Sequence, residues 1–178
     1  EEIKKELLAI PEKIEAVLEN QEGVKKYAAE NYEQRDIYFL GRGVDYAVAL
    51  EGSLKLKEIS YIHCDAYAGG ELKHGPIALI DKGTAVITLL TQEALKDKMV
   101  SNVREVSTRG GNIFAIANQG DEIAKTVAEE VVYIPKTVDL LTPLVSVVPL
   151  QLLSYYVAKN KGCDVDKPRN LAKSVTVE

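Results

Sequence analysis

Three charged side chains in the first third of the chain have the spacing of one helix face. Glu51, Lys55 and Glu58 occupy positions i, i+4 and i+7 of a segment whose composition predicts a helix over residues 44–60, so they share one face. A carboxylate beside an ammonium can act as a general base with a cation that steadies negative charge, as proton transfer between adjacent sugar carbons requires. A solvated stripe of ion pairs has the same spacing and is the commoner arrangement, so the pattern leaves both interpretations open.

The two histidines of the chain have different surroundings. His63 lies in the apolar stretch Tyr61–Cys64, which predicts a hydrogen-bonded histidine in the core. His74 lies among polar residues and glycines, directly before a Gly75-Pro76 break that limits how far a helix can continue. Because imidazole titrates near neutral pH, His74 is a candidate for proton transfer, with an ordinary surface histidine as the alternative.

Two further segments could contribute chemistry. Lys173 lies in the C-terminal tail, where most lysines are simply solvated, but a desolvated lysine can form a Schiff base with a carbonyl compound. Gly41-Arg42-Gly43 follows an apolar run and precedes a helix, which is where open parallel sheets bind ligands. This segment is not the GxGxxG dinucleotide fingerprint, and on spacing alone a tight turn is the commoner reason for its glycines.

These residues belong to a pattern of short apolar runs that alternate with helical stretches. Strands are expected at residues 37–40, 63–67, 85–90, 112–117 and 131–134. Helices are expected at residues 44–60, 92–109, 122–129 and 141–161, with a short broken helix at 71–79. The alternation predicts an α/β fold: a three-layer αβα sandwich with a five-stranded parallel sheet, of the doubly wound, flavodoxin-like kind. Lys55 and Glu58 are expected to approach one another at the carboxyl edge of this sheet.

Three regions are expected along the chain. Residues 1–35 form an amphipathic helical arm, in which Pro11 is expected to begin a second helix and residues 24–32 form a further one. Residues 36–162 form the sheet domain. Residues 163–178 show neither a helical nor a strand period, which predicts an irregular C-terminal tail.

Composition limits the partners and the location. The 178 residues include 22 basic and 27 acidic side chains, a net charge of −5, which argues against nucleic acid or an anionic membrane as the main partner. Two cysteines far apart make neither a disulfide framework nor a metal motif, so a reducing cytoplasm is expected, with no metal or cofactor. No apolar run approaches membrane-spanning length. The Glu-Glu-Ile start suggests a fragment of a longer chain.

Two dense segments resemble a known family. ALEGSLKLKEISYIHCDAYAGGELKHGPIALID at residues 49–81 and DKPRNLAKSVTVE at residues 166–178 are similar to the glucosamine-6-phosphate synthases, and the likeness covers the chain from residue 36 onward. That family joins a glutaminase domain to two sugar-isomerase (SIS) domains, and it converts fructose 6-phosphate and glutamine to glucosamine 6-phosphate and glutamate. The resemblance implies that this chain is the second SIS domain, that the other two domains are missing partners, and that the enzyme is a homodimer.

The resemblance also implies roles for individual residues. Glu58 matches the base that moves a proton between the first two sugar carbons, and Lys55 matches the lysine that assists it. His74 matches the histidine that opens the sugar ring and reaches the active site of the neighbouring subunit. Lys173 matches the lysine that forms a Schiff base with the ketose, in a tail that closes over the sugar. Two positions in the matching segments are implied as supporting substrate contacts, Glu51 and Arg169.

One feature of the family is missing. The family holds the sugar phosphate mainly through a Ser/Thr-rich loop of its first SIS domain, whereas the corresponding strand end here is Leu89-Leu90-Thr91-Gln92-Glu93, with one hydroxyl and a carboxylate. The isolated chain is therefore expected to bind fructose 6-phosphate or glucose 6-phosphate weakly and to be inactive. Two alternatives stay open: a stand-alone SIS module that binds a sugar phosphate and regulates a partner, and a non-aminating SIS isomerase of aldoses and ketoses.

Overall fold

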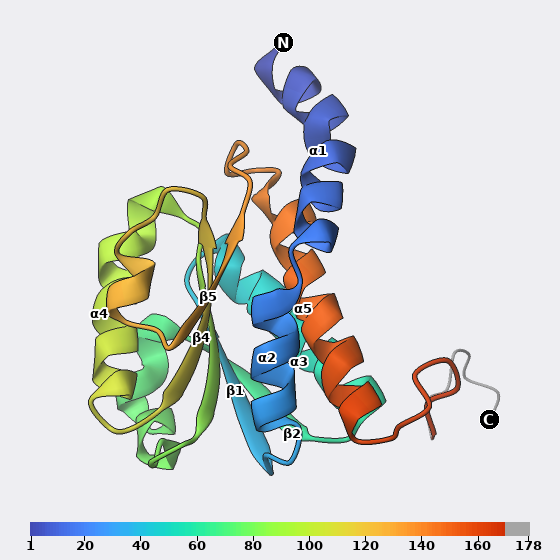
Figure 1. The fold of residues 1–178 in the computed structure, drawn as a ribbon. Coiled ribbons are helices and arrows are strands. Elements are labelled where there is room, and N and C mark those ends of the chain that lie inside the picture. The colour runs from blue at the N-terminus through green and yellow to red at the C-terminus, as the bar shows by residue number, and fades with distance from the viewer. Residues whose placement is uncertain (170–178) are drawn as a thin grey trace, which may run out of the picture.

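A five-stranded sheet runs through the computed structural model, which describes residues 1–169 (Figure 1). The strands are β1 (Asp36–Gly41), β2 (His63–Ala68), β3 (Ala85–Leu90), β4 (Asn112–Asn118) and β5 (Glu130–Ile134). Their order is β2-β1-β3-β4-β5, and every neighbouring pair is parallel. The predicted five-stranded parallel sheet is confirmed, and the strand order reverses between β1 and β3.

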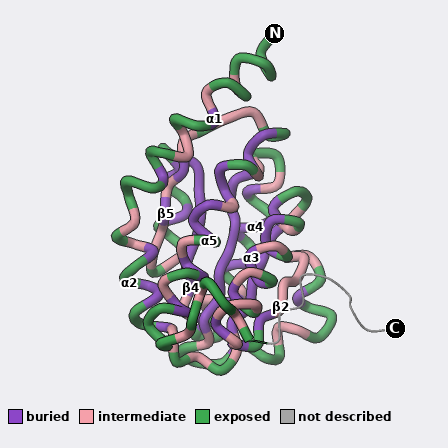
Figure 2. Tube along the Cα trace, turned by 90° about the vertical axis from the view of Figure 1, so that its right-hand side faces the viewer, coloured by how far each residue is buried: buried purple, intermediate pink, exposed green. Residues whose placement is uncertain are grey.

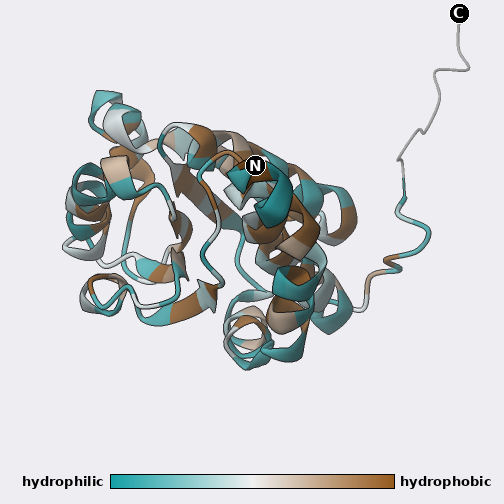
Figure 3. Ribbon diagram, turned by 90° about the horizontal axis from the view of Figure 1, so that it is seen from above, coloured by the Kyte–Doolittle hydropathy of each residue, from teal (hydrophilic) through white to brown (hydrophobic). Residues whose placement is uncertain are grey.

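Helices cover both faces of this sheet, as the three-layer prediction required. One face packs against α3 (Val44–Ser60) and α5 (Thr142–Asn160), with α2 (Glu22–Asn31) and part of α1 (Glu2–Glu19) beside α5. The other face packs against α4 (Lys96–Ser107). Figure 3 shows hydrophobic strands in the middle and largely hydrophilic helix surfaces outside. Within residues 1–169, no helix has the length and apolar character needed to cross a bilayer.

The residues of the central strands explain this layering. All six residues of β3 are buried, and successive side chains enter different cores. Ile87 and Leu89 pack with α3 and α5, whereas Val86 and Leu90 pack with α4. A strand that is covered on both faces has to be apolar at successive positions. These buried strands run through the middle of Figure 2.

The N-terminal helix does not break at Pro11. Helix α1 continues through this residue, so the expectation that a second helix begins there was wrong. A proline inside a helix removes one backbone hydrogen bond, but Pro11 is exposed, where water can pair with the freed carbonyl. The start of α1 protrudes and is exposed (Figure 2), while Tyr27 of α2 is buried and donates its hydroxyl to the Asn112 carbonyl at 2.9 Å.

The prediction of a helix at residues 122–129 was also wrong, because this segment forms only the 3-10 turn Ala124–Thr126. Asp121 Oδ1 accepts hydrogen bonds from the backbone amides of Ile123 (2.9 Å) and Ala124 (3.3 Å). Such a side chain to backbone turn competes with helix formation. The chain then enters β5 directly.

The segment after β2 follows its predicted break. Two 3-10 turns, Gly69–His74 and Pro76–Leu79, replace the short helix, and Gly75 separates them at φ 147°, a conformation that glycine adopts readily. Helix α4 likewise begins later than expected, because the 3-10 turn Glu93–Leu95 precedes it.

Candidate functional site

The side chains of Lys55 and Glu58 meet on α3, as their spacing predicted. Lys55 Nζ donates a hydrogen bond to Glu58 Oε2 at 2.6 Å, and Glu51 Oε1 lies 3.8 Å from the same nitrogen. The Lys55 side chain is 34% exposed and that of Glu58 is 22% exposed, so a ligand can reach both. The hydrogen bond with Glu58 raises the pKa of Lys55, which holds the lysine as an ammonium at neutral pH. The arrangement combines a candidate base with a fixed cation.

The place of this pair in the fold differs from expectation. It was expected at the carboxyl edge of the sheet, and this was wrong. Helix α3 begins just after the carboxyl end of β1 and ends just before His63, the first residue of β2. A helix that connects two parallel strands must run back against them, and Glu58 lies about 21 Å along the axis from Val44, at a rise of 1.5 Å per residue. The pair therefore lies toward the amino ends of the strands.

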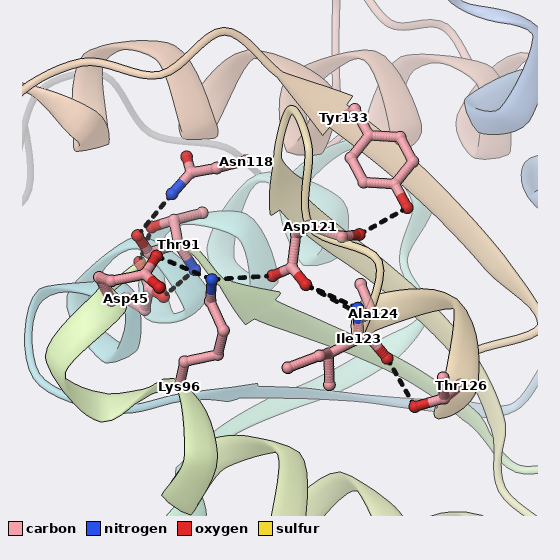
Figure 4. A network of polar contacts seen from close by, with 10 residues as sticks. Asp45, Thr91, Lys96, Asn118, Asp121, Ile123, Ala124, Thr126 and Tyr133 are labelled. Carbon is pink, nitrogen blue, oxygen red and sulfur yellow. Dashed lines mark hydrogen bonds and ion pairs between the residues drawn. The ribbon is translucent and has the colours of Figure 1, made fainter.

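The carboxyl edge of the sheet contains a buried polar network instead (Figure 4). Asp45, in the first turn of α3, accepts hydrogen bonds from the Thr91 hydroxyl (2.5 Å) and the Thr91 amide (2.9 Å). Asn118 donates to the Thr91 carbonyl at 2.8 Å. Burial raises the pKa of Asp45, against the lowering effect of the Thr91 hydrogen bonds. This network ties the ends of β3 and β4 to the start of α3.

The cations at the carboxyl edge are already paired within the chain. Lys96 Nζ lies 2.7 Å from Glu93 Oε2 and 3.2 Å from Asp121 Oδ2. Burial alone would lower the pKa of Lys96, but its hydrogen bonds with these two carboxylates outweigh burial and raise it. The Arg42 guanidinium donates to Asn102 Oδ1 at 2.9 Å. A phosphate dianion at this edge would compete with two carboxylates for Lys96 and with the Asn102 amide oxygen for Arg42.

His74 is not brought near the Lys55–Glu58 pair. It ends the 3-10 turn that follows β2, its side chain is 74% exposed, and its Nε2 lies 3.9 Å from Glu71 Oε2. Leu72 of the same turn packs in the core beside α4, whereas α3 packs on the opposite face of the sheet. Within one chain, the sheet therefore separates His74 from the pair.

The prediction that His63 lies in the core was wrong, because its side chain is 61% exposed. His63 opens β2, an edge strand, and its neighbour Cys64 takes the inward position. The ring Nδ1 lies 2.8 Å from Asp36 Oδ1, and Nε2 lies 3.7 Å from Asp65 Oδ2. This histidine is held at the amino edge of the sheet by carboxylates of two neighbouring strands.

The chain after α5 returns to the end of α3. The Arg169 amide donates a hydrogen bond to Tyr61 Oη at 2.9 Å, and the centre of the Arg169 guanidinium lies 4.3 Å from the centroid of the Tyr61 ring. Tyr61 is the residue that ends α3, one turn after Glu58. Lys173 lies outside the described residues.

The outer surface of α3 is apolar around these charges. Leu50 and Leu54 are exposed close to the charged pair, and Val44 is exposed at the opposite end of the helix. A groove of about 350 Å³ lies between α3 and α5, where Leu144 and Val147 form its other wall. Exposed apolar side chains gathered on one face are typical of a surface that another domain covers.

Comparison with known proteins places the chain in a family. The family model of the SIS domain matches residues 32–160. The chain belongs to the SIS domain family. This assignment agrees with the parallel sheet and with the resemblance in the segments around Glu58 and His74.

The relatives of this SIS domain are longer proteins. The chain is 64% identical over 178 residues to the isomerizing glutamine–fructose-6-phosphate aminotransferase of Clostridium tetani, covering 100% of this chain and 29% of that protein. The enzyme of that name from Clostridium perfringens is 63% identical over 180 residues, with 30% of it covered. The solved C-terminal domain of glucosamine-fructose-6-phosphate aminotransferase from Francisella tularensis is similar at a TM-score of 0.84 and 39% identity, covering 92% of this chain and 46% of that one. The SIS domain thus spans less than a third of these curated relatives.

Sequence reasoning missed two features of this SIS domain. The buried polar contacts at the carboxyl edge of the sheet left one signal in the sequence, which is Asp45, two residues after the Gly-Arg-Gly segment, in the first turn of α3. The contact between Tyr61 and Arg169 left none, because 108 positions separate the two residues. Within residues 1–169 no group of three His, Cys, Asp or Glu side chains could hold a metal ion.

Proposed function

We propose that this SIS domain is the sugar-isomerising part of an isomerizing glutamine–fructose-6-phosphate aminotransferase, which forms glucosamine 6-phosphate. The observation that carries the proposal is the accessible Lys55–Glu58 pair, 2.6 Å apart, in a chain 64% identical over its whole length to such an enzyme. The pair has the chemistry that transfer of a proton between neighbouring sugar carbons needs.

Each residue then has a step in the reaction. His74 exchanges a proton with the ring oxygen and opens the sugar ring. The Lys173 amine attacks the C2 carbonyl of the open ketose and expels water, which leaves a Schiff base. Ammonia derived from glutamine replaces the lysine nitrogen, and Glu58 then takes a proton from C1 and returns it at C2. Lys55 steadies the negative charge that develops on the neighbouring oxygen.

The position of His74 supports a site built by two subunits. The sheet lies between this histidine and the Lys55–Glu58 pair, and the His74 side chain is 74% exposed. An exposed histidine can enter the site of a second copy across a symmetric interface. We therefore assign the enzyme a homodimer in which each sugar site takes His74 from the other subunit.

Subunit mixing tests this arrangement in the full-length enzyme. His74→Ala and Glu58→Gln enzymes are each expected to be inactive. Equal amounts, unfolded and refolded together, should recover about a quarter of wild-type activity, because half of the dimers are mixed and each mixed dimer has one intact site. Refolding each variant alone is the control. No recovery in the mixture, with mixed dimers demonstrated by mass, would contradict the shared site.

The apolar face of α3 supports the proposal that other domains are missing partners. Leu50 and Leu54 are exposed beside the charged pair, and the chain covers 29% of its relative from Clostridium tetani. The first SIS domain is the proposed occupant of this face, where it would supply the phosphate-binding loop. Cys64 and Cys163 are free, which fits the cytoplasm expected from the sequence.

The isolated chain is expected to bind fructose 6-phosphate or glucose 6-phosphate weakly, with a Kd of about 1 mM or higher. Lys96 and Arg42 at the carboxyl edge already have partners within the chain, so a phosphate dianion finds little compensation for its lost hydration. Titration calorimetry on this chain and on the full-length enzyme makes the comparison. Micromolar one-to-one binding by the chain alone would favour the sugar-phosphate sensor instead.

A further inference from the structure

Tyr61 makes two separate contacts with the first part of the C-terminal tail. Its hydroxyl oxygen accepts a hydrogen bond from the Arg169 amide at 2.9 Å. Its ring faces the Arg169 guanidinium, whose centre lies 4.3 Å from the ring centroid, a favourable cation–π distance. One contact uses the backbone of Arg169 and the other its side chain, so together they fix both the position and the direction of the chain at this point.

The backbone of Tyr61 is a second, independent observation. Tyr61 ends α3 with φ 62°, and within residues 1–169 it is the one residue other than glycine with positive φ. Glycine adopts this conformation at a helix end without steric cost, whereas a side chain is strained there. A tyrosine at this position therefore costs conformational energy. The contacts of its side chain with Arg169 offset this cost.

The path from α5 to Tyr61 is also ordered by hydrogen bonds. Asp164 Oδ1 accepts from the backbone amides of Asp166 and Lys167, each at 3.0 Å. Pro168 follows and restricts the backbone directly before Arg169. The tail thus leaves α5 through a fixed turn, and Arg169 is held against the end of α3.

We propose that Tyr61 is a positioning residue that anchors the start of the C-terminal tail, at Arg169, to the end of α3 close to Glu58. Tyr61 lies three residues after Glu58, about 4.5 Å along the helix axis. Lys173 follows Arg169 by four residues in the sequence, so an anchor at Arg169 is expected to speed the reaction of this lysine with a sugar that Glu58 also contacts. The inference rests on the proposed function, in which these two side chains act on one sugar. It also assigns Arg169 to the anchor rather than to a direct sugar contact.

Three substitutions in the full-length enzyme test the anchor. Tyr61→Gly removes both contacts and relieves the backbone strain, Tyr61→Phe removes only the hydroxyl, and Tyr46→Phe is the matched control on the first turn of α3. The readout is the initial rate at which borohydride traps fructose 6-phosphate on Lys173. Tyr61→Gly is expected to trap about tenfold more slowly, equivalent to about 1.4 kcal/mol, with an unchanged or higher melting temperature. Tyr61→Phe should lose about threefold, and Tyr46→Phe should match the wild type.

A second readout does not depend on the sugar chemistry. Trypsin cleavage of this chain after Arg169 requires the anchor to open, and the preceding Lys167-Pro168 bond resists the enzyme. Tyr61→Gly should speed the cut after Arg169 by about tenfold, the same factor as the loss of trapping. If wild-type enzyme traps no sugar, the proposed function fails, while the cleavage rates still decide the anchor.

Two results would overturn the anchor. The first is equal trapping and equal cleavage in Tyr61→Gly and wild type. The second concerns the case in which Tyr61→Gly loses thermal stability, so that Tyr61→Phe has to decide. If Tyr61→Phe then matches the control Tyr46→Phe in both trapping and cleavage, the hydroxyl of Tyr61 has no anchoring role. A drop in trapping without any loss of melting temperature is the result that a purely structural role of Tyr61 does not produce.

Discussion

Glu58→Gln in the full-length enzyme is expected to lower the rate of glucosamine 6-phosphate formation by about a hundredfold or more, the usual contribution of a positioned base. The amide keeps the size of the side chain and can still contact Lys55, but it is a very poor base. In the proposed order of steps the Schiff base on Lys173 forms before the proton moves, so borohydride should still trap fructose 6-phosphate on this variant. Product formation and trapping are measured on the same preparation.

A matched control separates this effect from loss of an ion pair. Glu122 pairs with Lys125 at 3.8 Å with the same i, i+3 spacing, on an exposed surface. Glu122→Gln is expected to leave the rate unchanged, and neither variant should lose more than about 1 kcal/mol of stability, because exposed ion pairs contribute little. A Glu58→Gln enzyme with near wild-type product formation would show that another group is the base.

Lys173→Arg should fail at an earlier step and abolish covalent trapping altogether. Arginine keeps a positive charge near the sugar but stays protonated, so it cannot attack the C2 carbonyl as an amine. The measurement is the mass of the borohydride-reduced enzyme after incubation with fructose 6-phosphate, followed by mapping of the modified peptide. An adduct that persists in Lys173→Arg would assign the amine to a different lysine.

The sheet and its layers could be predicted because burial leaves a local signal. The run Ala85–Leu90 is apolar at every position except Thr88, which marks a strand covered on both faces. The spacing of Lys55 and Glu58 likewise fixes their contact, since residues three apart on a helix are neighbours. Both features depend on residues close together in the chain.

The errors arose where distant residues decide the local structure. His63 has apolar neighbours in sequence, but its strand lies at the edge of the sheet, so its side chain is exposed. Asp121 caps a turn and pairs with Lys96, and this network replaces the helix that local propensity predicted. The contact between Tyr61 and Arg169 depends on how the chain after α5 returns to α3, which no pattern in the sequence indicates.

The hydrogen at C1 of the sugar shows directly whether Glu58 is the base. Fructose 6-phosphate with deuterium at C1 is incubated with wild-type and Glu58→Gln enzyme together with glutamine, and the label is followed by NMR. We expect the wild type to remove deuterium from C1 and to deliver a proton or the label to C2. Glu58→Gln should retain the label at C1 although it still forms the Schiff base. Loss of the C1 label at the wild-type rate in Glu58→Gln would contradict the assignment of the sugar proton to the Lys55–Glu58 pair.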